Sequence, residues 1–250
     1  MIEVKSICKS FDSNVVIDNI STRFEKGRTN LVIGQSGSGK TVLLKCILGL
    51  YEVDSGEIYY NDREFTTMND KKRKELRQEI GMVFQGGALF DSLTVEQNVQ
   101  FPLDMFTYQT TKEKQSRVDF CLDHVNIKGA HKLYPSEISG GMKKRVAIAR
   151  AIALNPKYLF CDEPNSGLDP ETATRIDKLI QEITREFDIT TIINTHDMNS
   201  VIEIGEMVLF ISDGKKCWEG TKHEILNTPN NELNKFIFAN KLYAQMKQGG

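Results

Sequence analysis

The residues that most clearly suggest chemistry form a glycine-rich run near the amino terminus. Residues 34–41 read Gly-Gln-Ser-Gly-Ser-Gly-Lys-Thr, which fits the P-loop pattern G-x-x-x-x-G-K-[ST]. Glycines let main-chain N–H groups converge on phosphate oxygens, and the N-terminus of a following helix adds a positive dipole end. Lys40 would reach the outer phosphates of a nucleotide, and the Thr41 hydroxyl would ligate Mg²⁺. The residues predicted to contact the nucleotide here are Gly34, Ser36, Gly37, Ser38, Gly39, Lys40, Thr41 and Val42.

A second candidate is an apolar run, Tyr158–Asp162, that is followed directly by Glu163. In P-loop enzymes a carboxylate at the end of a neighbouring strand holds the magnesium shell, which suits Asp162. Glu163 is then placed to orient and polarise the attacking water. Two carboxylates after an apolar run are common at ordinary strand ends, so this interpretation depends on the P-loop upstream.

A third candidate is the segment Ser139-Gly140-Gly141, which precedes an amphipathic stretch over residues 143–154. A serine and two glycines at a helix start offer an anion a hydroxyl, accessible N–H groups and the helix dipole. The same residues also fit a helix N-cap without any ligand. The segment by itself leaves both interpretations open.

The elements that would position these residues predict an α/β fold. A short apolar strand over 29–33 runs into the P-loop, and a helical pattern over 41–48 follows it, as in the opening of a βαβ unit. Strands separated by helices imply a mainly parallel sheet. Residues from about 88 to 155 are helix-rich and more polar, and we expect them to form an insertion. Further strands are predicted over Tyr158–Asp162, Ile189–Asn194 and Met207–Ser212, a helical face at Ala173, Ile176, Leu179, Ile180, Ile183 and Phe187, and a terminal helix at Leu233, Phe236, Ile237, Ala239 and Leu242.

Composition excludes several classes of protein. The chain has 250 residues and a formal net charge of −2, which argues against a strongly basic nucleic-acid binder. Charged residues interrupt every apolar run before the ~18 residues that a membrane-spanning helix needs, and the N-terminus has no signal-peptide pattern. The cysteines are odd in number and scattered, which predicts reduced thiols that pack as small hydrophobes. We therefore expect a soluble protein that is not secreted. The cysteines are Cys8, Cys46, Cys121, Cys161 and Cys217.

The order of these motifs resembles that of the ATP-binding cassette (ABC) family over the chain up to about residue 220. Gln85 resembles the family's Q-loop glutamine, and His196 resembles its switch histidine. The segment Ser166-Gly167-Leu168-Asp169 resembles the D-loop, and Phe11 stands where the family places an aromatic ring that stacks on adenine. The resemblance implies a P-loop NTPase (RecA-like) sheet with an N-terminal antiparallel β subdomain and a helical insertion. It places the cassette in residues 1–220, with the helical subdomain at about 88–155, and a C-terminal helical extension in 221–250.

The resemblance also implies an ATPase that works as a homodimer. ATP and Mg²⁺ would be bound between the P-loop of one copy and Ser139, Gly140 and Gly141 of another. Asp169 would couple the two sites. The implied catalytic residues are Glu163, His196 and Gln85, and the implied magnesium ligands are Thr41, Gln85 and Asp162.

The segments 87–95 and 138–142, the second ending at Met142, most resemble the ATPases of MCE-type, Mla-like phospholipid transporters. Met142 and the apolar pair Leu89 and Phe90 also fit plain packing residues of a more general importer ATPase. The Mla-like branch implies integral-membrane (MlaE-like) permease subunits, an MCE-domain periplasmic subunit and a place on the cytoplasmic face of the bacterial inner membrane. It leaves open whether a STAS-like regulatory subunit also binds. The alternatives are an importer ATPase for a small solute such as an amino acid, or an ABC ATPase that acts on nucleic acid. We expect no nucleic-acid partner, and we interpret the basic run Lys71-Lys72-Arg73-Lys74 as a solvated helix face.

Overall fold

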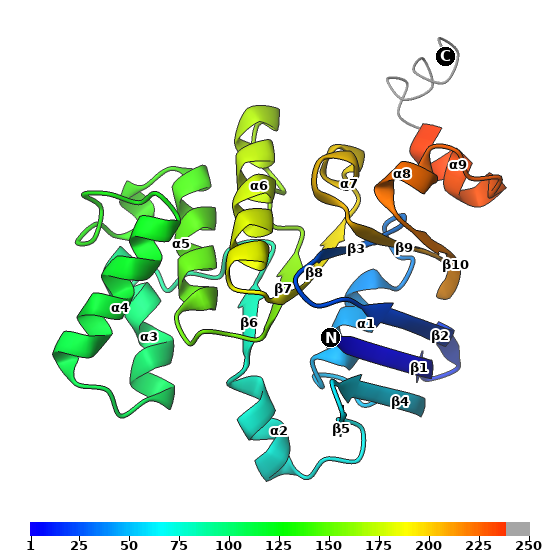
Figure 1. Cartoon of the computed structure of the whole chain (residues 1–250), viewed down its shortest axis with the longest axis horizontal. Helices are drawn as coiled ribbons and strands as arrows, with labels where there is room; N and C mark the ends of the chain where they lie inside the picture. Colours follow the sequence, from blue (N-terminus) through cyan, green and yellow to red (C-terminus); the bar gives the residue numbers. More distant parts are fainter. Residues whose placement is uncertain (239–250) are drawn as a thin grey trace. The chain divides into compact units, whose positions relative to one another are not determined.

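The structure, a computed structural model, describes residues 1–238, which divide into two units (Figure 1). The first unit joins residues 1–68 to the described residues from 194 onward, and the second contains residues 69–193. Among the described residues, no helix is both long enough and apolar enough to cross a bilayer.

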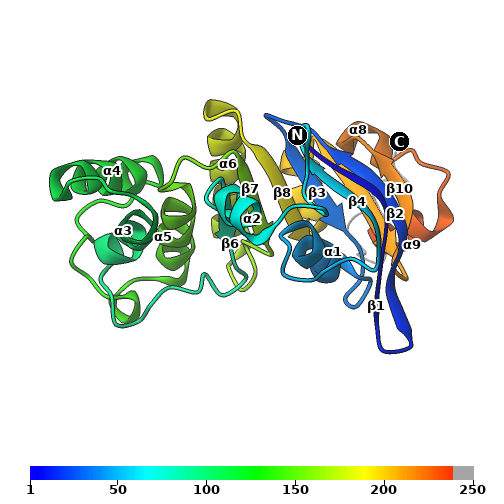
Figure 2. The same ribbon diagram turned by 90° about the horizontal axis from the view of Figure 1, so that it is seen from below.

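The first unit begins with an antiparallel sheet in the order β2-β1-β4-β5. Ile2 of β1 lies opposite Phe24 of β2 on one side and Tyr60 of β4 on the other. All three of these side chains are buried, because alternate residues of each strand face the core. The β1–β2 hairpin is the long dark-blue ribbon of Figure 2. The strands are β1 (Ile2–Phe11), β2 (Asn14–Phe24), β4 (Ser55–Tyr60) and β5 (Arg63–Glu64).

The same unit contains the strand that leads into the P-loop. β3 (Thr29–Ile33) is buried along its whole length and pairs in parallel with β9 (Met207–Ser212), which forms a hairpin with β10 (Lys215–Gly220). Helix α1 (Lys40–Ile47) starts directly after the loop. A buried strand that ends at the loop fixes one end of it, and the buried face of α1 fixes the other.

The carboxyl-terminal part of the first unit adds short helices. In α9, Leu233 and Ile237 are buried, and the Phe236 ring lies 5.4 Å from that of Phe210 between centroids. The predicted terminal helix is therefore present in part; Ala239 and Leu242 lie outside the described residues. The helices are α7 (Met198–Ile204), α8 (Lys222–Ile225) and α9 (Asn231–Phe238).

The second unit carries β6, β7 and the first four residues of β8, in the order β8-β7-β6. β6 pairs in parallel with β7, with Val83 opposite Cys161. Asp169 caps α6 by accepting from the Thr172 N–H, and the apolar face predicted for this helix is buried. In α2 the basic run is exposed except for a half-buried Arg73, which confirms the solvated face. These elements are α2 (Asp70–Arg77), β6 (Ile80–Val83), β7 (Tyr158–Asp162), α6 (Pro170–Glu186) and β8 (Thr190–Thr195).

Three helices of the second unit pack against one another and stay grouped in both views (Figures 1 and 2). Thr94 and Thr110 begin α3 and α4 with capping boxes. In each box the threonine hydroxyl accepts from the N–H three residues later, and the side chain of that later residue accepts from the threonine N–H. Ser139 caps α5, which extends from the helical group to β6 and α6. The helices are α3 (Val95–Phe106), α4 (Thr111–His124), the 3₁₀ turn η1 (Pro135–Glu137) and α5 (Gly140–Ile152).

The α/β fold that the sequence predicts is confirmed, with one antiparallel sheet and strands paired in parallel in each unit. All five cysteines are free, and Cys46, Cys121 and Cys161 are buried. Burial raises the pKa of the Cys46 and Cys121 thiols to about 11. These thiols are therefore packing groups, as predicted.

Candidate functional site

The P-loop of the first unit is a tight turn built from main chain. Gly37 and Gly39 have φ values of +82° and +105°, a left-handed conformation that favours glycine. A Cβ atom on Gly39 would lie 2.9 Å from the Val16 carbonyl oxygen, and one on Gly34 would lie 2.2 Å from that of Ile211. Larger residues would therefore distort the loop.

Lys40 and Ser38 point their polar atoms into this turn. The buried Lys40 donates to the main-chain oxygens of Gly34 at 2.8 Å and Gln35 at 2.9 Å. Within the described part of the chain, the buried Ser38 hydroxyl has no hydrogen-bond partner. A buried hydroxyl without a partner is costly, and a bound acceptor such as a phosphate oxygen would satisfy it. The loop thus fits a phosphate group, whose oxygens would accept from the Ser38 hydroxyl and from the Lys40 ammonium.

Two further predicted residues belong to the same unit. The Phe11 ring is 39% exposed and meets the Tyr51 ring edge-on, with centroids 5.1 Å apart. A base can stack on the exposed face of such a ring. His196 directly follows β8, and its side chain is exposed. Tyr51 is a further candidate residue of this site that the sequence analysis missed, because only the fold brings its ring next to Phe11.

In the second unit, the side chain of Gln85 reaches the predicted catalytic carboxylate. Its Nε2 atom donates to Oε2 of Glu163 at 3.0 Å and lies 3.4 Å from the Ser166 hydroxyl. Glu163 follows β7 with a φ of +46°, an uncommon conformation for a residue other than glycine. Such strain is frequent at functional sites. Asp162, at the end of β7, is partly exposed.

Lys144 of α5 joins this group from another direction. Its side chain is only 7% exposed, and its ammonium donates to the main-chain oxygen of Gln85. Burial lowers the pKa of Lys144, and the nearby charge of Glu163 opposes that shift. The sequence analysis missed this residue. The available signal was its position four residues before the buried Ile148, on the buried face of the helix.

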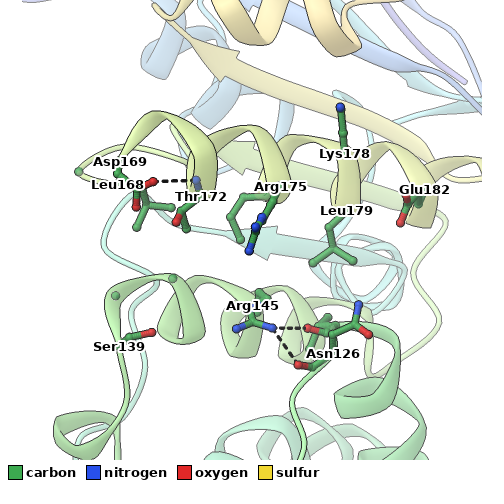
Figure 3. Close-up of a pocket in the computed structure, with 15 residues that line it drawn as sticks. Asn126, Ser139, Arg145, Leu168, Asp169, Thr172, Arg175, Lys178, Leu179 and Glu182 are labelled. Atoms are coloured by element: carbon green, nitrogen blue, oxygen red, sulfur yellow. Dashed lines mark hydrogen bonds between the residues drawn. The ribbon is translucent and has the colours of Figure 1, made fainter.

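The segment Ser139-Gly140-Gly141 lies beside Asp169 at one end of a pocket of ≈ 750 Å³ between α5 and α6 (Figure 3). Ser139 accepts from the Met142 N–H at 3.2 Å, so it does cap its helix, yet it is exposed. Hydrogen bonds from Thr172 hold the pKa of Asp169 below its usual range. A Cβ on Gly141 would come within 2.9 Å of Thr172, so this approach of the two helices requires glycine.

The predicted residues thus fall into two groups. Residues of the P-loop, Phe11 and His196 belong to the first unit, whereas Gln85, Asp162, Glu163, Asp169 and the Ser139 segment belong to the second. Within the second unit, the structure brings Gln85 to Glu163 and the Ser139 segment to Asp169.

A profile of the family described as "ABC transporter" matches residues 17–166. The chain belongs to this family. It is the ATPase subunit of an ABC transporter. The matched residues include the P-loop and the Ser139 segment.

The chain is similar to the ATP-binding proteins of two kinds of transporter. Methionine import ATP-binding protein MetN of Clostridium tetani is 39% identical over 237 residues, which cover 95% of this chain and 74% of that protein. MetN of Haemophilus influenzae is 40% identical, and the matched region covers 93% of this chain and 68% of that protein. The intermembrane phospholipid transport system ATP-binding protein MlaF of the same species is 35% identical, with 95% and 90% covered. The MlaF-like assignment is thus not favoured over MetN.

Solved structures of ABC ATPases share the fold. A dimeric ATP-binding cassette in a post-hydrolysis state with ADP and Pi has a TM-score of 0.80 and 29% identity, covering 89% of this chain and 99% of its own. CbiO1 of Clostridium perfringens, part of the ABC transporter complex CbiONQ, has a TM-score of 0.86 and 28% identity, with 98% of both chains covered.

Proposed function

We propose that the P-loop binds the phosphates of ATP and that Glu163 orients the water which attacks the terminal phosphate. The observation that carries this proposal is the buried, unpartnered Ser38 hydroxyl, which lies in a glycine turn beside Lys40 in the described structure. Phosphate oxygens are strong acceptors for both groups. Phosphoryl transfer needs little more from the protein than positioning and charge stabilisation.

Mg²⁺ would be held by the Thr41 hydroxyl, the Asp162 carboxylate and the Gln85 side-chain oxygen. These are hard oxygen donors, the kind Mg²⁺ prefers, and the nucleotide and water would supply the remaining ligands. When bound, the ion neutralises charge that develops on the phosphate oxygens. His196, exposed after β8, would contact the terminal phosphate, and Phe11 would stack on the base.

We also infer that the active form is a homodimer, in which Ser139, Gly140 and Gly141 of a second copy close over the nucleotide. Ser139 is exposed at the start of α5, where N–H groups and the helix dipole face outward. The dimeric form of the related cassette supports this inference. Asp169 lies at the same end of the pocket and would couple the two sites.

The permease subunits of the transporter would dock near Phe90, at the cytoplasmic face of the inner membrane. The Phe90 ring is 41% exposed and lies 4.7 Å from that of Phe101, while Asn98 fixes the Phe90 main chain from both its N–H and its oxygen. A rigid, partly exposed aromatic pair is a suitable receptor for an apolar helix. ATP-driven closure of the dimer would then move the permease.

For the cargo, we propose a small solute such as an amino acid. The MetN relatives are 38–42% identical to the chain, against 35% for MlaF. Phospholipid is the second candidate, and the observation that favours it is Met142 after the Ser139 segment, together with the MlaF relative. An MCE-domain subunit and a STAS-like subunit belong to that second candidate only.

The two cargoes can be separated with the ATPase and its permease reconstituted in lipid nanodiscs. We expect methionine, delivered with its binding protein, to raise phosphate release, and transfer of labelled phospholipid to an acceptor vesicle to stay at background. The opposite result would favour the lipid candidate. The Glu163→Gln complex is the control in both arms, because it should show neither activity.

A further inference from the structure

Helix α5 holds the loop that contains Gln85 through two buried or half-buried cations. Lys144 donates to the main-chain oxygen of Gln85. Arg150 donates to the oxygens of Gly87 and Ala88, each at 2.7 Å. Gly87 and Ala88 both have positive φ, so the loop changes direction where Arg150 holds it. The main chain on either side of Gly86 is thereby attached to one rigid helix.

Of these two cations, only Lys144 also approaches the catalytic group. Lys144 holds the main chain of Gln85, whose side chain donates to Glu163, and the charge of Glu163 opposes the lowering of the Lys144 pKa. Arg150 instead lies against the Phe90 ring, 5.8 Å from its centroid. The two cations therefore have separate tasks, one at Glu163 and one at the proposed permease surface.

A buried ammonium on this helix has no obvious benefit for folding. Removing a charge from water costs several kcal/mol, and an apolar side chain of similar volume is often as stable or more so. The face around Lys144 is otherwise apolar, with Ile148 and Ile152 following it along the helix. The cation is better explained by what it contacts.

We propose that Lys144 is a positioning residue for ATP hydrolysis, which fixes the main chain at Gln85 and the carboxylate of Glu163 relative to the helix that starts at Ser139. The inference rests on the roles proposed above for Gln85 and Glu163. Because Gln85 Nε2 donates to Glu163, a shift of the Gln85 main chain would move both groups together. Ser139 precedes Lys144 by about one and a half turns of helix. A shift of α5 caused by a contact at Ser139 would therefore be passed to Gln85 and Glu163 over a short distance.

The test compares Lys144→Met with Lys144→Arg in the full-length chain. Met fills a similar volume without a donor or charge, whereas Arg keeps both. We expect Lys144→Met to lower kcat for ATP about ten- to hundredfold, as the loss of an outer-shell partner commonly does. KM for ATP should stay within about twofold, because the P-loop is untouched. Lys144→Arg should recover most of kcat.

Two further variants make the result decisive. Lys143 lies next to Lys144 on the same helix, and its side chain is half-buried. The matched variant Lys143→Met should keep wild-type kcat. Glu163→Gln tests the underlying assignment: if it hydrolyses ATP normally, the proposed roles fail. If Glu163→Gln is inactive and Lys144→Met retains wild-type kcat, only the Lys144 inference is overturned. It is also overturned if both Lys144 variants lose activity in proportion to a lowered melting temperature, since that indicates a structural role alone.

Discussion

The P-loop and the Gln85–Glu163 group illustrate two ways of building a functional group of residues. The P-loop is a contiguous stretch in which glycines set the main-chain conformation, and its main-chain N–H groups would form the proposed binding surface. The Gln85–Glu163 group consists of side chains from three separate segments, after β6, after β7 and on α5, linked by hydrogen bonds. The conformation of the P-loop is encoded locally, whereas the Gln85–Glu163 group forms only when distant segments of the chain pack correctly.

This difference predicts different consequences for substitution. Damage to the P-loop should weaken nucleotide binding, because we propose that this loop contacts the phosphates directly. Damage to the Gln85–Glu163 group should leave binding intact and slow the chemical step, because the role proposed for those side chains is to align the reacting groups. Three substitutions test that division, and a fourth tests an ion pair elsewhere in the second unit.

The largest effect is expected for Glu163→Gln. An amide of the same shape cannot polarise the attacking water, so turnover should fall about a thousandfold or more. Binding should persist and trap the ATP-bound dimer. Phosphate release measures turnover and size-exclusion chromatography measures the dimer. Turnover at the wild-type rate would remove Glu163 from its proposed role.

Lys40→Ala should act on binding instead. Loss of a charged donor is worth about 1.5–3 kcal/mol, so ATP affinity should fall at least about tenfold. Isothermal titration with ATP and Mg²⁺ measures the affinity. Lys5→Ala, an exposed lysine on β1 of the same unit, is the control and should bind normally. Unchanged affinity for Lys40→Ala would contradict the P-loop assignment.

Ser38→Ala tests one proposed phosphate contact of the P-loop. Because the described structure gives this hydroxyl no partner, its removal should not destabilise the apo protein. It should cost about 1 kcal/mol of ATP binding, the value of one neutral hydrogen bond. The melting temperature without and with ATP measures both quantities. A drop without ATP, or an unchanged shift on adding ATP, would count against a phosphate contact.

The smallest effect concerns the helical part of the second unit. A hydrogen bond from Lys114, 2.8 Å from Asp104, lowers the pKa of this carboxyl in the folded state. A lowered folded pKa means that the stabilisation is present above the unfolded value of about 4 and is lost as the pH falls through the folded value. Asp104→Asn should therefore cost about 0.2–1 kcal/mol at pH 7 and nothing in strong acid. Urea unfolding at the two pH values checks this; equal costs at both would contradict the ion pair.

Several elements were predictable because their signals are local. β7 and β9 have the predicted bounds, since short apolar runs bordered by polar residues have few other folded solutions. β6 and β10 were not predicted: Ile80–Val83 is a short strand containing a glycine, and Lys215–Gly220 is mostly polar. Each becomes a strand because a neighbouring strand satisfies its main-chain groups.

The P-loop can be predicted without a fold, because glycine and lysine at fixed spacing dictate a local main-chain conformation. The family can be recognised in the same way, from the order of the motifs along the chain. The contacts of Lys144 with Gln85 and of Gln85 with Glu163, across 59 and 78 residues of chain, are visible only in the folded protein. Contacts at such separations depend on how β6, β7 and α5 pack, and no local rule of sequence contains that information.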